Sequence, residues 1–170
     1  MAIHIETERL VLTELSDDDA EFVLGLVNEP SFLRYIGDRG VRTLPDAVRY
    51  IRQGPVASYA KYGYGLLRVG LKPAGTPIGI CGVLRRDTLP DPDIGFSLLP
   101  AWWARGFAHE AAAAAMTHAR ETLAVGRVLA ITTTDNDPSI RLLAKLGFRF
   151  DRLVRLGDDP ADLRLFISDP

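Results

Sequence analysis

The sequence has little of what marks several large classes of protein. Cys81 is the only cysteine among 170 residues, so the chain has no internal disulfide, which is typical of a reducing compartment. With 20 Lys and Arg against 22 Asp and Glu, its formal net charge is -2, and no basic stripe is available for phosphate contacts. No apolar run approaches a membrane span, and charges come too early for a secretory signal. We expect a soluble, cytoplasmic protein that binds neither nucleic acid nor membrane.

Signatures of metal and nucleotide chemistry are also missing. The three histidines have no zinc-site spacing, since His109 and His118 are separated by nine positions on one predicted helix and His4 is near the terminus. Neither a Walker-type phosphate loop nor a dinucleotide fingerprint occurs. Cys81 lies in the apolar stretch "IGICGVL", which favours a buried core thiol over a nucleophile, because a nucleophile needs a partner histidine and a lowered pKa. We expect no metal site.

The apolar pattern predicts one α/β domain over residues 1–170. Hydrophobic residues make up 47% of the chain, enough for one core of ordinary size. Short turn-rich connections join the early strands, which predicts an antiparallel meander, whereas crossover helices in the second half imply a partly parallel sheet. The predicted strands are 9–15, 64–71, 77–86, 92–99, 127–134, 148–156 and 162–167, and helices begin after Ser16 and near Pro45, Phe107 and Asp137.

The stretch "LLPAWWARGFAHEAAAAA" has the pattern of an anion site. A strand ends at Leu99, and Gly106 lies where the chain must turn tightly into a helix that begins near Phe107. Unpaired N–H groups and the positive end of the helix dipole favour phosphate at such a place, and Arg105 adds a cation. A glycine before a helix is also typical of an ordinary turn, so both interpretations stay open.

A second stretch, "TTTDNDPSIRLLAKLGF", leaves a strand and enters a helix. We expect Asp137 as its N-cap, Pro138 at the first helical position and a left-handed C-terminal residue at Gly147. Asn136 and Ser139 then present an amide and a hydroxyl toward the same edge.

Taken in order, the blocks "ETERLVLTEL", "DIGFSLLPAWWARGFAHEA" and "NDPSIRLLAKLGF" resemble the GNAT superfamily of N-acetyltransferases, specifically the branch of the Rim-type acetyltransferases of ribosomal protein N-termini. The resemblance covers nearly the whole chain. It implies a GNAT fold, in which a mixed central sheet with helices on both faces is splayed to admit acetyl-CoA. It also implies acetyl transfer to a primary amine, on a protein N-terminus or a small molecule, by direct attack in a ternary complex.

The resemblance assigns roles to the cofactor-binding residues. The loop before the long helix would hold the coenzyme A pyrophosphate through its backbone amides. Leu98 and Leu99 would hydrogen-bond the pantetheine arm, and Asn136 would contact the arm from the far side. Trp103 stands where many members have Gln or Arg, so a polar contact there must come from the backbone or the indole N–H. The pyrophosphate loop comprises Ala104, Arg105, Gly106, Phe107 and Ala108.

The proton donor departs from the superfamily pattern. Many members place a tyrosine seven residues after the matching asparagine, and that position is Leu143 here. Ser139 matches the serine that is proposed to protonate the departing thiolate in the Rim-like branch. The alternative is a helix-terminal serine that satisfies local backbone.

The candidate base is Asp93. Alternation along "PDIGFSLL" sends Ile94 and Phe96 to one face of the strand and Asp93 and Ser97 to the other. We expect the Asp93 carboxylate in the cleft, with a raised pKa, relaying a proton directly or through water. A structural turn acid and a contact for a substrate ammonium are its two alternatives.

Phe32, Arg34 and Tyr35 lie between the first two predicted helices, where this family forms a wall of the acceptor site, and are candidate substrate contacts. A non-catalytic acyl-CoA-binding or regulatory domain is the alternative function, and Leu143 in place of tyrosine favours it. A structural domain with a degenerate cleft is a further alternative, against which the intact "RGFA" loop argues. The sequence does not identify the amine acceptor and leaves open whether the chain forms a homodimer.

Overall fold

The computed structural model describes residues 2–170, and its centre is an eight-stranded sheet with the order β1-β2-β3-β4-β5-β6-β8-β7. The strands are β1 (His4–Glu6), β2 (Leu10–Glu14), β3 (Leu67–Leu71), β4 (Thr76–Leu84), β5 (Asp93–Leu98), β6 (Val128–Thr133), β7 (Arg149–Val154) and β8 (Leu163–Ser168). All but β1 were predicted. β1 is three residues long and exists because it pairs with β2.

Strand directions confirm the mixed α/β sheet. β1 to β5 form antiparallel neighbours, β5 and β6 are parallel, and β6, β8 and β7 are again antiparallel. The chain passes from β6 to β7 through a crossover helix, and β8 then returns between them. The parallel part is therefore the β5–β6 pair.

Six α-helices flank the sheet in the described residues: α1 (Ala20–Val27), α2 (Pro30–Tyr35), α3 (Leu44–Ile51), α4 (Ala57–Tyr62), α5 (Phe107–Glu121) and α6 (Asp137–Lys145). Ser16 is the N-cap, as predicted, and forms a capping box with Asp19, although the first turn, Asp17–Asp19, is a 3-10 helix. Thr43 and Asp46 cap α3 in the same way. The six-residue helices α2 and α4 were not predicted.

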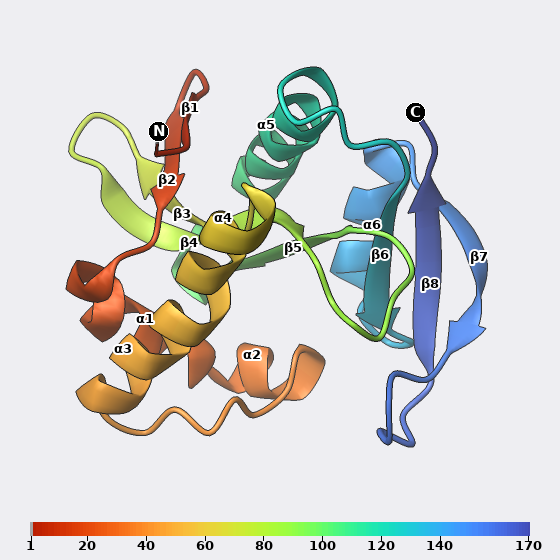
Figure 1. Cartoon of the computed structure of the whole chain (residues 1–170), viewed down its shortest axis with the longest axis horizontal. Coiled ribbons are helices and arrows are strands. Elements are labelled where there is room, and N and C mark those ends of the chain that lie inside the picture. The colour runs from red at the N-terminus through yellow and green to blue at the C-terminus, as the bar shows by residue number, and fades with distance from the viewer. Residues whose placement is uncertain (1) are drawn as a thin grey trace.

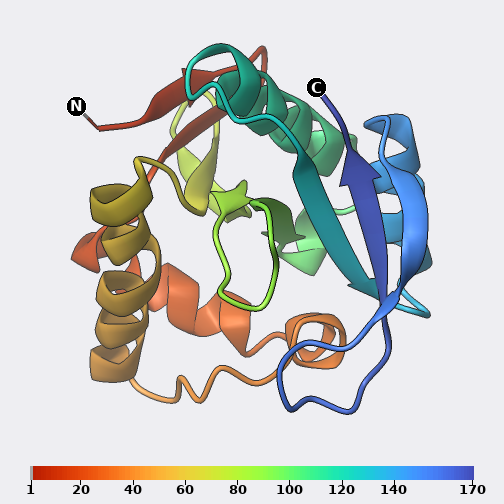
Figure 2. The same cartoon turned by 45° about the vertical axis from the view of Figure 1, so that its right-hand side comes forward.

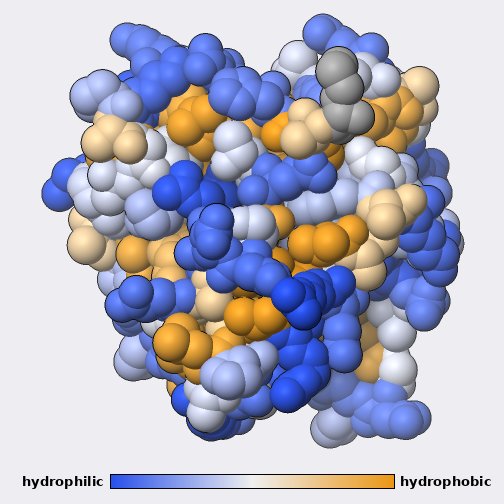
Figure 3. Space-filling view, turned by 60° about the vertical axis from the view of Figure 1, so that its left-hand side comes forward, coloured by the Kyte–Doolittle hydropathy of each residue, from blue (hydrophilic) through white to orange (hydrophobic). Residues whose placement is uncertain are grey.

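The helices form two layers. α5 and α6 pack on one face of the sheet, and α1 to α4 cover the other face (Figures 1 and 2). The buried alanines of α5 let the helix lie close to the sheet, and Ile94 and Leu98 join this core, as the alternation of β5 predicted. On the side of α3 and the first strands, hydrophobic side chains are scattered among hydrophilic ones (Figure 3).

Cys81 on β4 is completely buried, and burial raises the pKa of its thiol to about 12. The interpretation as a core thiol is therefore confirmed. In residues 2–170 no helix combines the length and the hydrophobicity that crossing a membrane requires.

Candidate active site

The parallel pair β5–β6 stays together over a single residue pair. Asp93 is aligned with Leu129, and the Leu129 N–H donates to the Pro92 carbonyl over 2.8 Å. No further pair joins the two strands in the described chain, and β5 and β6 diverge toward their carboxyl ends (Figure 1). Beyond this pair the facing edges of β5 and β6, up to Leu98 and Thr133, are unpaired, and we call the separation between these edges the gap.

Backbone groups of β5 alternate between the two edges of the strand. The Leu99 N–H donates to Ile78 on β4 (2.8 Å), and the Leu99 carbonyl accepts from the Trp102 N–H (2.9 Å). The Leu98 groups therefore face the gap, where the Leu98 carbonyl accepts from Trp103 Nε1 (2.9 Å) and its N–H stays available. Of the two predicted arm contacts, Leu98 fits the geometry; Leu99 does not, because both of its backbone groups already have partners.

The loop before α5 has the conformation of an anion site. Ala104 and Gly106 take left-handed φ angles of 60° and 80°, and Gly106 is the N-cap of α5, which begins at Phe107 as predicted. Within residues 2–170, no backbone or side-chain group accepts from the N–H groups of residues 104–109. Residues 103–106 are exposed, which leaves the free N–H groups of residues 104–106 at the surface.

The N-terminus of α6 lies beyond the end of β6. Its N-cap is Asn136 and not Asp137, because the Asn136 Oδ1 accepts from the Ser139 N–H over 3.4 Å. Ser139 is half-buried, and its hydroxyl makes no hydrogen bond within residues 2–170. Leu143, one turn further along, is completely buried, and Gly147 ends the helix at φ 87°, as predicted.

The Asp93 carboxylate, which we expected in the cleft with a raised pKa, is enclosed by the protein and does have a raised pKa. Its side chain is 0% exposed, and Arg86 Nε lies 3.1 Å from both carboxylate oxygens. Burial raises the pKa of Asp93 to about 6, against the opposing charges of Arg86 and Arg85. The partner Arg86 was missed, although it follows β4 and the β4–β5 hairpin aligns Leu84 with Asp93.

Tyr50 on α3 extends this polar cluster. Burial raises the pKa of Tyr50, whereas the positive charges of Arg39 and Arg86 act to lower it. Two cations therefore lie near the Tyr50 phenol. The cluster therefore joins α3, the loop before it and the end of β4 on the face opposite α5.

The predicted acceptor residues separate into two groups. Phe32 is 3% exposed and packs in the core with α1 and α3, so its expected contact with an acceptor is not supported. Arg34 is exposed and lies 3.0 Å from the Asp135 carboxylate, with its guanidinium 4.8 Å from the Tyr35 ring centroid. This ion pair links α2 to the loop that carries Asn136.

Comparisons with known proteins agree with this geometry. Residues 9–149 match the family model of the acetyltransferase (GNAT) domain. The uncharacterized N-acetyltransferase YoaA of Bacillus subtilis (strain 168) is 28% identical over 153 residues, which cover 89% of this chain and 85% of YoaA. The chain belongs to the GNAT family and is an acetyltransferase, as the resemblance predicted.

Solved structures support the fold. The acetyltransferase from Agrobacterium tumefaciens str. C58 has a TM-score of 0.84 at 26% identity, covering 99% of this chain and 95% of that one. RimL, a ribosomal L7/L12 alpha-N-protein acetyltransferase in complex with coenzyme A, has a TM-score of 0.82 at 15% identity, with 98% of both chains covered. At that identity the likeness to RimL concerns the fold alone.

Proposed function

We propose that this chain transfers the acetyl group of acetyl-CoA to a primary amine, either a protein N-terminal α-amine or a small-molecule amine. The observation that carries the proposal is the gap between β5 and β6, which pair at Asp93 and Leu129 alone. The loop before α5 and the N-terminus of α6 supply donors near its open end. The acetyl thioester would lie in this gap.

The coenzyme would be held from two sides. The free N–H groups of residues 104–108 face the pyrophosphate, and Arg105, whose guanidinium lies 5.2 Å from the Trp102 ring centroid, supplies a cation. The Leu98 N–H on one side of the gap and Asn136 on the other contact the pantetheine arm. RimL, whose fold this chain shares, binds coenzyme A, which supports this arrangement.

The reaction needs no covalent enzyme intermediate. The neutral amine nitrogen attacks the thioester carbonyl carbon, and another backbone N–H on the gap-facing edge of β5, near Leu98, stabilises the negative oxygen that forms. The C–S bond then breaks, the Ser139 hydroxyl gives its proton to the departing thiolate, and the serine oxygen regains a proton from water. An α-amino group, with an ordinary pKa of about 8, supplies the neutral amine more readily than a lysine at about 10.4.

The proton lost by the amine would pass to Asp93. Asp93 is buried and accepts a hydrogen bond from Arg86, so it takes this proton through water and not by direct contact with the amine. Arg34 and Tyr35 remain the candidate acceptor contacts, since both are accessible on α2.

The test is acetyl-CoA-dependent thiol release across N-terminal peptides, lysine peptides and small amines. One acceptor should stimulate release, and Ser139→Ala and Asp93→Asn should slow it while acetyl-CoA affinity, measured by calorimetry, is kept. If acetyl-CoA binds but no acceptor stimulates thiol release, the chain is better explained as an acyl-CoA-binding domain. The buried Leu143 in place of a tyrosine favours that alternative. Absence of acetyl-CoA binding overturns the proposal.

A further inference from the structure

Arg9, just before β2, reaches three parts of the junction between the exposed loop and α5. Its Nε and Nη2 each lie 2.7 Å from Glu110 Oε2, and its Nη1 donates to the Arg105 carbonyl over 3.1 Å. Its guanidinium carbon lies 4.3 Å from the Phe107 ring centroid. One side chain from the start of the chain therefore fixes a loop almost a hundred residues away.

Glu110 is fully occupied by the same segment. Its Oε1 accepts from the Thr7 hydroxyl (2.6 Å) and from the Arg9 N–H (2.9 Å). Burial acts to raise the pKa of Glu110, but the hydrogen bonds from Thr7 and Arg9 outweigh it and lower that pKa. Glu110 is therefore an ionised carboxylate in the first turn of α5, where the free N–H groups favour an incoming anion.

We propose that Arg9 is a positioning residue for the pyrophosphate of acetyl-CoA. The inference rests on the proposed function, because it assumes that the loop before α5 binds this group. Arg9 acts through the backbone and through charge, and it does not contact the phosphates itself, since its guanidinium is directed to Glu110 and to the Arg105 carbonyl.

The backbone effect follows from peptide geometry. The Arg105 carbonyl and the Gly106 N–H belong to one planar trans peptide and point in opposite directions. By holding the carbonyl, Arg9 turns the Gly106 N–H away from β2 and toward solvent. Arg9 also lies beside Gly106 itself, since a Cβ added at Gly106 would be in van der Waals contact with Arg9 Nη2, at 3.4 Å.

The charge effect concerns Glu110. Without the Arg9 guanidinium, the Glu110 carboxylate would have no neighbouring cation beside the helix N-terminus and would repel a pyrophosphate. An ordinary exposed ion pair has no such consequence, because it joins two side chains and fixes no backbone. Arg127 and Asp169 lie 2.8 Å apart, and Asp169 also pairs with Arg149 over 3.0 Å, so Arg127 takes part in exposed ion pairs of this ordinary kind.

The test compares two acetyl donors. Acetyl-CoA carries the pyrophosphate, whereas S-acetylpantetheine carries the arm and the thioester without it. Arg9→Met should raise the dissociation constant and KM for acetyl-CoA about tenfold, the effect of one charge-assisted hydrogen bond, and leave KM for S-acetylpantetheine and both kcat values within about twofold. Arg127→Met should leave the binding and the KM of both donors unchanged.

Other outcomes are decisive in different ways. The positioning role is overturned if Arg9→Met weakens the binding of both donors equally, or the binding of neither. A native protein that does not prefer acetyl-CoA to S-acetylpantetheine refutes the pyrophosphate site of the proposed function instead.

Two further variants keep the proposal testable if Arg9→Met does not fold. Arg9→Lys keeps the positive charge but lacks the planar guanidinium, so it should still weaken the binding of acetyl-CoA. Native affinity for acetyl-CoA in this variant overturns the backbone effect. Adding Glu110→Gln to Arg9→Lys should recover part of the lost affinity, and a further loss of affinity overturns the charge effect.

Discussion

The indole Nε1 of Trp103 donates a hydrogen bond to the Leu98 carbonyl oxygen, 2.9 Å away. This bond ties the loop before α5 to the edge of β5 that faces the gap. Trp103 is nevertheless 48% exposed, because the indole plane lies on the surface while its one polar atom is satisfied. Of the two coenzyme contacts considered for Trp103, the indole N–H is thus already used within the chain, and the backbone remains.

The left-handed conformation of Gly106 gives the first prediction. Gly106→Ala should destabilise the fold by about 1 kcal/mol and raise the acetyl-CoA dissociation constant roughly tenfold, because the loop amides lose their alignment. Gly63→Ala is the matched control, since Gly63 has φ 81° at the end of α4, with open space around it. It should lose similar stability with unchanged affinity. If both variants have the same affinity for acetyl-CoA, Gly106 does not contribute to the binding site.

Ser139 is predicted to be the proton donor. Ser139→Ala should lower kcat roughly 100-fold with little change in the KM for acetyl-CoA, because the thiolate must leave unprotonated. Stability should not fall, since alanine favours the helix. Asp137→Ala removes a polar group from the same helical turn and should leave kcat unchanged. A native kcat in Ser139→Ala would favour a purely structural serine.

The raised pKa of Asp93, about 6, predicts the pH dependence of catalysis. If Asp93 accepts the amine proton, it must be ionised, so kcat/KM should rise with pH through about 6 and the Asp93→Asn variant should lack this rise. A profile that keeps the rise in Asp93→Asn would assign it to another group.

Asp93 also predicts a pH dependence of stability. The folded chain holds the Asp93 proton more tightly than the unfolded chain, so this contribution is full below about pH 3.9 and is lost as the pH rises through about 6. Urea unfolding should show the free energy of the native protein falling over this range relative to Asp93→Asn. A constant difference between the two proteins would contradict the raised pKa.

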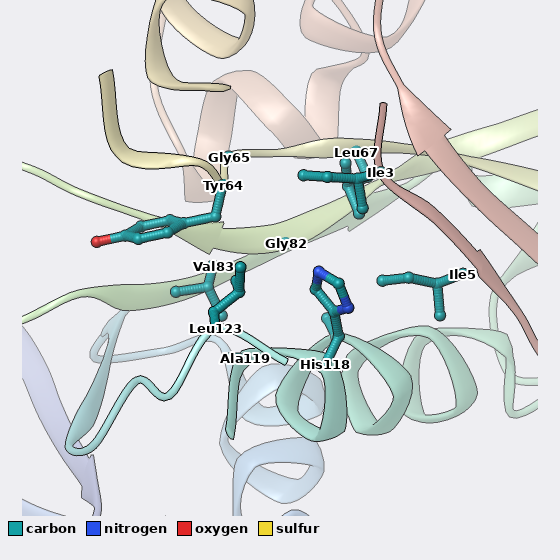
Figure 4. Close-up of a pocket in the computed structure, with 11 residues that line it drawn as sticks. Ile3, Ile5, Tyr64, Gly65, Leu67, Gly82, Val83, His118, Ala119 and Leu123 are labelled. Carbon is teal, nitrogen blue, oxygen red and sulfur yellow. The ribbon is translucent and has the colours of Figure 1, made fainter. Parts of the chain in front are cut away.

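His118 predicts a pH dependence of stability opposite to that of Asp93. Its ring points from α5 toward Ile5 and the sheet, beside a cavity of about 10 Å³ (Figure 4), and its Nε2 is buried without a partner in the described residues. Burial lowers the pKa of His118, so stability is complete above its ordinary value of about 6.5 and declines as the pH falls below it. His118→Leu should abolish this decline in urea unfolding, whereas the exposed control His4→Gln should retain it.

Much of the candidate site was predictable because it depends on local conformation. A glycine that takes positive φ, a proline in a first helical turn and the alternation of a strand are decided within a few residues. The start of α5 at Phe107 and the left-handed Gly147 were accordingly predicted correctly. The N-cap of α6 differed by one position, because Asn136 and Asp137 are both good caps.

The differences from expectation concern residues whose surroundings come from distant segments. Phe32 was assigned to the acceptor site, but packing against α1 and α3 buries it. Asp93 was expected in the cleft, but its carboxylate is completely buried beside Arg86. Burial is a property of the packed assembly, and the alternation of a single strand indicates its faces without saying what covers them.

Within the described residues, the sequence by itself determined seven of the eight strands, four of the six α-helices, the mixed sheet and the turn at Gly106 before α5, because hydrophobic periodicity and backbone preferences are local. Only the tertiary structure decided that β5 and β6 separate after Asp93 and Leu129, that Leu98 and not Leu99 faces the gap, and that Arg9 fixes the loop before α5. These relationships join segments far apart in the chain, and they arise when the sheet and helices pack together to bury a common core.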